Sequence, residues 1–61
     1  MLDYEVYFLN EAHHFRDVEF LTERDDSTAI ATSRRLLAAR IDFVGFEVWQ
    51  GERLLAFEVR P

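Results

Sequence analysis

Cysteine and lysine are both absent from this chain of 61 residues, which has only two glycines and one proline. The absence of cysteine excludes a disulfide framework, a thiolate nucleophile and a cysteine-ligated metal site. The scarcity of glycine excludes a glycine-rich loop of the kind that cradles phosphate groups. A domain of this length buries only about 60% of its unfolded surface, so we expect association to contribute to its stability.

Long apolar runs are missing as well, and none approaches the roughly 18 residues that a membrane-spanning helix requires. The segment Met1–Glu5 is acidic and lacks the apolar region of a secretory signal, so we expect a cytoplasmic protein without a membrane partner. The net charge is -5, and all seven basic residues are arginine. Because a phosphate backbone repels an acidic protein, we expect no nucleic-acid partner.

Apolar residues, by contrast, are abundant: 49% of the chain is hydrophobic and 15% is aromatic. Such a composition argues against disorder, despite the high charge. It also favours association, because a small domain cannot enclose that much apolar surface by itself.

The first third of the chain has the alternation of a β-hairpin. Residues 2–9 and 15–21 alternate with period two and are rich in aromatic and β-branched side chains, which predicts two strands. Pairing Val6 with Val18 leaves Glu11–His13 as a three-residue loop, a common hairpin length.

A helix is predicted from about Ser27 to Ala39. Asp25 and Ser27 are typical of a helix start, because their side chains accept hydrogen bonds from the free N–H groups of the first turn. Arginines cluster toward the other end, where positive charge is favoured, but no glycine marks the stop. One apolar stripe at helical spacing holds Ala29, Ile30, Ser33, Leu36 and Leu37.

The last third predicts a second hairpin from residues 43–49 and 53–59. A two-residue loop of Gln50 and Gly51 pairs Phe46 with Leu55 and puts apolar partners on one face. Gly51 in the second loop position supplies the positive φ of a type I′ turn.

Two hairpins around one helix predict a single α+β domain over residues 1–61, with the order β-β-α-β-β. The expected fold is a four-stranded antiparallel sheet with one helix packed on one face. Strand orders 2-1-3-4 and 1-2-4-3 both keep every neighbour antiparallel, and we favour the first. The expected helix-facing residues are Tyr4, Val6, Phe8, Val18, Phe20, Val44, Phe46, Val48, Leu55, Phe57 and Val59.

The opposite face of the sheet should be polar if only water covers it. Its expected polar residues are Asp3, Glu5, Asp17, Glu19, Glu47 and Glu58. The same face is also predicted to carry an apolar set, comprising Tyr7, Leu9, Phe15, Leu21, Phe43, Trp49 and Leu54. Scattered surface hydrophobes are normal, but the aromatic types here are those favoured at interfaces. We therefore predict that this set forms an interaction site.

Residues with catalytic or metal-binding chemistry are few. His13 and His14 are adjacent and lack a third strong ligand, so we interpret them as a solvated turn and expect no metal or cofactor. Ser27 and Ser33 have no histidine at the spacing of a catalytic triad. We expect that the protein is not an enzyme.

Two short motifs resemble those of a group of hypothetical proteins from alphaproteobacteria, to which no activity is assigned. The motifs are Asp25-Asp26-x-x-Ala29-Ile30 at the helix start and Glu47-x-Trp49-x-Gly51-x-Arg53 in the second hairpin. This chain departs from the group at Arg40-Ile41-Asp42, where a glycine-containing turn is expected. The resemblance implies a small cytoplasmic protein from a GC-rich bacterium.

The function predicted from these features is a non-enzymatic protein-interaction module. We expect its partner to be a second copy, giving a homodimer through the aromatic sheet face, with another protein as the other possible partner. The alternative is an acidic inhibitor or nucleic-acid mimic that occupies a basic site on a partner protein. A small metal or RNA binder is a third, less favoured possibility.

Overall fold

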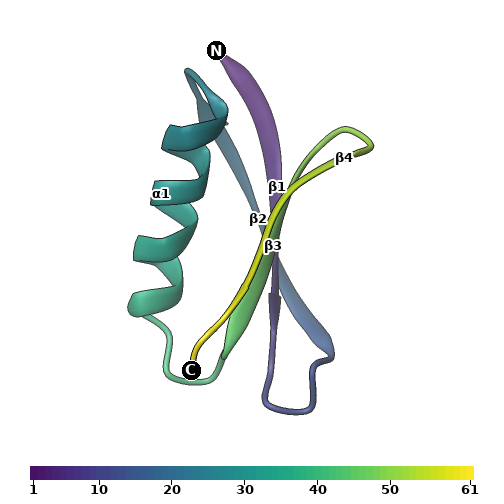
Figure 1. The fold of residues 1–61 in the computed structure, drawn as a ribbon, viewed down its shortest axis with the longest axis vertical. Coiled ribbons are helices and arrows are strands. Elements are labelled where there is room, and N and C mark those ends of the chain that lie inside the picture. The colour runs from purple at the N-terminus through teal and green to yellow at the C-terminus, as the bar shows by residue number, and fades with distance from the viewer.

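The computed structural model describes residues 1–61 and confirms the predicted β-β-α-β-β fold. Figure 1 shows a single helix lying on one side of the sheet, while no element covers the other side. The elements are β1 (Leu2–Leu9), β2 (Phe15–Glu23), α1 (Asp26–Ala38), β3 (Gly45–Gln50) and β4 (Arg53–Val59).

The four strands follow the order β2-β1-β3-β4, and every neighbouring pair is antiparallel. The favoured order is therefore confirmed. Strands β1 and β3 occupy the centre of the sheet, so β2 and β4 are its edges. The single helix, at 13 residues, does not have the length and apolarity needed to cross a membrane.

The loop between β1 and β2 has the predicted length. The amide of Asn10 donates to the carbonyl of His14 at 3.0 Å, which leaves three residues between them. His13 takes the left-handed conformation with φ 60°. The side-chain oxygen of Asn10 accepts hydrogen bonds from the amides of Ala12 and His14, and so stabilises the turn.

Immediately after this loop, a β-bulge shifts the register of β2 by one residue. Leu9 lies opposite Phe15, but Phe8 lies opposite Asp17, so Arg16 is the extra residue. Because side chains alternate between the two faces of a strand, this shift turns the rest of β2 over. Val18 and Phe20 therefore lie on the face away from the helix, and the prediction that they face it was wrong.

The hairpin between β3 and β4 also differs from its predicted register. Gln50 pairs with Arg53, so the loop is Gly51 and Glu52 instead of Gln50 and Gly51. Gly51 has φ 59° and is the first loop position, an arrangement typical of a type II′ turn.

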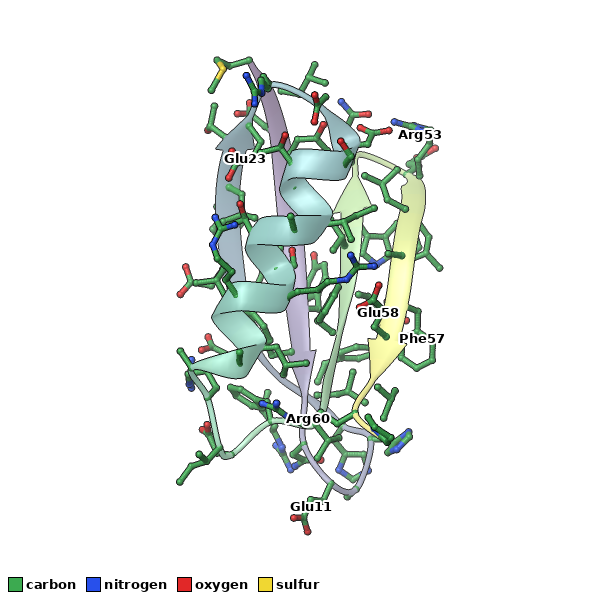
Figure 2. The ribbon with its side chains drawn as sticks, turned by 60° about the vertical axis from the view of Figure 1, so that its left-hand side comes forward. Glu11, Glu23, Arg53, Phe57, Glu58 and Arg60 are labelled. Carbon is green, nitrogen blue, oxygen red and sulfur yellow. The ribbon has the colours of Figure 1, made fainter.

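A second bulge, at Leu55, shifts the register between β3 and β4 by one more residue. Trp49 pairs with Leu54 and Val48 with Ala56, which leaves Leu55 between them. As a result Phe57 and Val59 lie on the face away from the helix, where they were not expected. Glu58 points the other way and pairs with Arg34 of α1 at 2.6 Å. Figure 2 shows Phe57 and Glu58 extending from opposite sides of β4.

The helix begins one residue earlier than predicted. Asp25 is its N-cap, with an extended backbone and a side-chain oxygen that accepts from the amide of Thr28 at 2.8 Å. The predicted apolar stripe is the packed one: Ala29, Ser33 and Leu37 are buried against the sheet.

The end of the helix is stabilised by a residue from the far end of the chain. The guanidinium of Arg60 donates to the carbonyls of Leu37, Arg40 and Phe43. Of the three, only Leu37 belongs to the helix, and its carbonyl also accepts from the amide of Arg40 at 3.0 Å. Arg60 therefore reinforces a helix end at which no glycine-containing turn is present. Figure 2 places Arg60 beneath the C-terminal end of α1.

The core lies between the helix and the sheet. It consists of Tyr4, Val6, Phe8, Ala29, Leu37, Phe43, Phe46 and Val48, with Leu21, Leu36, Leu55 and Ala56 packed against it. Two members correct the sequence prediction for the opposite face. Leu21 is brought to the helix side by the β2 bulge, and Phe43 precedes β3, so strand alternation does not apply to it. Phe43 stacks on Phe8 with ring centroids 5.6 Å apart.

Candidate interaction surface on the open face of the sheet

The face of the sheet that the helix leaves uncovered, which we call the open face, follows directly from the strand register. Residues directly opposite one another in neighbouring strands share a face, and this places three rows of side chains across the sheet. Taken from β2 to β4, the rows are Phe20-Glu5-Trp49-Leu54, then Val18-Tyr7-Glu47-Phe57, then Phe15-Leu9-Gly45-Val59.

The two edge strands give the open face apolar margins. Five large side chains are exposed there: Phe20 by 72%, Phe57 by 52%, Phe15 by 50%, Leu54 by 48% and Val59 by 39%. Single exposed hydrophobes are ordinary, but a group on one face is typical of a surface that contacts another molecule.

The two central strands supply a different set of side chains. Glu5 lies opposite Trp49, and Tyr7 lies opposite Glu47, so the carboxylates and the aromatic rings occupy alternate corners of a square. The Nε1 of Trp49 donates to Oε1 of Glu47 at 2.9 Å, which leaves the second oxygen of Glu47 without a hydrogen bond from the protein. Burial and the neighbouring Glu5 carboxylate raise the pKa of the Tyr7 hydroxyl above its usual value.

An open hollow of about 560 Å³ lies over this square. Its lining residues are Glu5, Tyr7, Phe15, Glu47, Trp49, Gly51 and Glu52. The ring of Phe15 meets that of Tyr7 edge-on, with centroids 6.2 Å apart, and closes one side. Three of the lining residues are glutamates and none is basic.

The ion pairs of the molecule all lie elsewhere. Arginine and carboxylate atoms meet in four pairs, namely Arg34–Glu58, Arg40–Asp17, Arg40–Asp42 and Arg53–Asp26. Arg34–Glu58, Arg40–Asp17 and Arg53–Asp26 each connect the helix, or a residue just after it, to a strand of the sheet. None of the four pairs includes Glu5, Glu47 or Glu52. The carboxylates of the hollow therefore have no cationic partner within the chain.

The interaction site predicted from the sequence is partly assembled on this face. Tyr7, Phe15, Trp49 and Leu54 are on it; Leu9 belongs to it too, but is only 1% exposed. Leu21 and Phe43 are on the helix side. The residues that were missed are Val18, Phe20, Phe57 and Val59, for which the alternation was visible in the sequence but the two bulges were not.

The residues considered for catalysis or metal binding are not brought together. His13 and His14 are exposed in the β1–β2 loop, and no group of three or more histidine or carboxylate side chains is placed to hold a metal ion. The Ser33 hydroxyl donates to the carbonyl of Ala29, and the Ser27 hydroxyl donates to Asp25. Both serines thus take part in helix hydrogen bonding.

The chain matches no protein-family model, no curated protein and no solved structure. The predicted resemblance to alphaproteobacterial proteins stays a prediction.

Proposed function

We propose that this chain is a non-catalytic binding module that engages another protein through the open face of its sheet. The proposal rests on one observation: the large apolar side chains of both edge strands are exposed together on this face. Removing apolar surface from contact with water lowers the free energy, so the binding of a partner that covers this surface is favoured. Aromatic side chains, which dominate the face, are often responsible for affinity at interfaces.

The two central carboxylates favour one class of partner. A protein that covers both apolar margins also covers Glu5 and Glu47, and burying a carboxylate without a cation is strongly unfavourable. A second copy packed about a two-fold axis would present its own Glu5 and Glu47 to the same interface. We therefore favour a different protein, with a basic group at the centre of an apolar surface, over the homodimer expected from the sequence.

The alternative function, an acidic inhibitor or nucleic-acid mimic, also requires a basic partner, but it depends on charge alone. The apolar margins favour the binding module, because charge mimicry gives these side chains no role. Salt separates the two: a module held by apolar margins keeps much of its affinity at high ionic strength, whereas a charge mimic loses it.

The test uses matched substitutions of exposed hydrophobes. Phe20→Asp and Phe57→Asp each place a charge on a margin of the open face, while Ile41→Asp changes a fully exposed residue between α1 and β3. Proteins captured by the wild-type chain are then purified and titrated against each variant by calorimetry.

We expect the purified partner to bind the Ile41→Asp variant as it binds the wild type, and the open-face variants at least tenfold more weakly. Circular dichroism and thermal melting must first show that the variants are folded. Equal binding to all four proteins would exclude the open face as the interface. A purified wild-type chain that is dimeric by light scattering would instead identify a second copy as the partner.

A further inference from the structure

The hollow over β1 and β3 has a chemistry of its own within the open face. Four side chains surround its centre: Glu5 and Glu47 at one pair of opposite corners, and Tyr7 and Trp49 at the other. An inference about what this hollow holds rests on the proposed function, because the open face must meet a partner for it to be filled.

Electrostatics favour a cation in this position. Glu5 and Glu47 are partly buried, have no ion-pair partner in the chain, and are joined at the rim by Glu52. A partner that covers them removes water from around the carboxylates, so it must supply positive charge in exchange. The net charge of -5 attracts a cationic group from a distance as well.

The aromatic corners favour an organic cation. The faces of tryptophan and tyrosine rings attract positive charge within about 6 Å, and tryptophan does so most strongly. The hydrogen bond from Nε1 of Trp49 to Glu47 orients the indole beside the carboxylate, and the edge of Phe15 supports Tyr7. Carboxylates and aromatic rings thus line the same space.

We propose that this hollow binds the guanidinium group of an arginine side chain from the partner protein. A guanidinium is planar, so its faces can lie against aromatic rings while its N–H groups donate outward to carboxylates. Because Glu5 and Glu47 lie on different strands at opposite corners, donors that spread in one plane are directed toward both of them. An ammonium group concentrates its charge on one strongly hydrated atom and suits this arrangement less well.

The test uses the position of Trp49, which is the sole tryptophan and therefore reports on the hollow through its fluorescence. The probes are the peptides acetyl-Leu-Arg-Leu-amide, acetyl-Leu-Lys-Leu-amide and the analogue with citrulline, which has the shape of arginine but no charge. We expect the arginine peptide to change the emission of Trp49 in a saturable manner, the lysine peptide to bind several-fold more weakly, and the citrulline peptide to have no effect.

Glutamine substitutions then identify the carboxylates responsible. Glu5→Gln and Glu47→Gln should each weaken arginine-peptide binding by about tenfold, since each removes a charge-assisted contact. Glutamine at position 47 keeps an oxygen that accepts from Trp49, so the ring position is retained. Glu11→Gln, at the tip of the β1–β2 loop in Figure 2, removes the same charge away from the hollow and should leave binding unchanged.

Three results would overturn the inference. Binding of the lysine peptide as tight as that of the arginine peptide would refute the guanidinium assignment. No saturable change in Trp49 emission, or equal loss of affinity in Glu11→Gln and Glu47→Gln, would refute the site. In each case a purified partner that still requires Phe20 and Phe57 leaves the binding module standing, which separates the two failures.

Discussion

At the scale of single residues, the two glycines meet quite different requirements. Gly45 begins β3, and a Cβ atom there would come within 2.5 Å of the backbone oxygen of Glu58 in β4. Gly51 has φ +59° but open space around it. One glycine is therefore required by close approach of two strands, and the other by the conformation of a turn.

These roles predict a difference between two alanine substitutions. Gly45→Ala forces β3 and β4 apart at a buried position, and we expect it to lower the free energy of unfolding by about 2–3 kcal/mol. Gly51→Ala only places a side chain in the left-handed region, at about 1 kcal/mol. Urea unfolding of both variants measures the difference. A loss at Gly45 no larger than that at Gly51 would contradict the close-contact explanation.

Tyr4 gives the fold a pH dependence at both extremes. Its burial, and the hydrogen bond that its hydroxyl donates to Asp26 at 2.8 Å, raise its pKa from 10.0 to about 12. The same hydrogen bond, with one from Arg53, lowers the pKa of the Asp26 carboxyl below 3.8. A raised tyrosine pKa stabilises the fold below pH 10, and a lowered carboxyl pKa stabilises it above pH 3.8.

We therefore expect the stability conferred by Tyr4 to disappear between about pH 10 and 12, and that conferred by Asp26 to disappear as the pH falls below about 3.8. Tyr4→Phe should reduce both the loss of stability above about pH 10 and the loss below about pH 3.8, because it removes the hydroxyl that donates a hydrogen bond to Asp26. Urea unfolding across the pH range measures the stability, and ultraviolet absorbance follows tyrosine ionisation. Ionisation of Tyr4 near pH 10 in the folded protein would disprove the assignment.

At the scale of elements, α1 depends on residues outside its own sequence. Asp25 caps its start, but its end is stabilised by Arg60, which donates to three backbone carbonyls after β4 has returned to the helix. These hydrogen bonds to the end of the helix can form only when β4 is in its place in the sheet.

Arg60→Ala should consequently destabilise the fold by about 2 kcal/mol, because it leaves partly buried carbonyls without their charged donor. Arg24→Ala is the control, since Arg24 is exposed and forms no ion pair or side-chain hydrogen bond with the protein. Thermal and urea unfolding compare the two variants. Equal stability of both would show that the bonds from Arg60 contribute nothing to the fold.

The positions of the strands and the helix could be predicted from the sequence, but the faces of two strands could not. Alternation located all four strands, and the N-cap signal located the helix to within one residue. The predicted orientation of the side chains on β2 and β4 was wrong, because one extra residue in each strand reverses the faces of the residues beyond it. These extra residues are Arg16 in β2 and Leu55 in β4. Nothing in local composition marks either bulge, and the inward position of Glu58 becomes understandable only once Arg34 is seen beside it.

At the scale of the whole molecule, charge is divided between the two faces of the sheet. The arginines of the helix side pair with Asp17, Asp26, Asp42 and Glu58, while the carboxylates of the hollow have no such partner. The open face is thus apolar at its margins and negative at its centre. We propose that this pattern opposes self-association and favours a basic partner.

Neutralising Glu5 and Glu47 should remove the charge repulsion that opposes self-association. We expect the wild-type chain to be monomeric, and the double variant Glu5→Gln, Glu47→Gln to form dimers as its concentration rises, because the apolar margins then meet without burying like charges. Light scattering over a concentration series measures this, with Glu11→Gln, Glu19→Gln as the matched control, because both of these exposed glutamates lie outside the hollow. A double variant that stays monomeric at every concentration would show that the central charges do not limit self-association.

The sequence by itself determined the order of elements, the helix start, the paired strands and an apolar surplus on one side of the sheet. These follow from local periodicity, capping chemistry and composition, which act over a few residues. Only the tertiary structure decided which side chains make up that surplus, and that Glu5, Tyr7, Glu47 and Trp49 form one square. The physical reason is that strand alternation relates neighbours within a strand, whereas the bulges and the register of β1 against β3 depend on contacts across the whole chain.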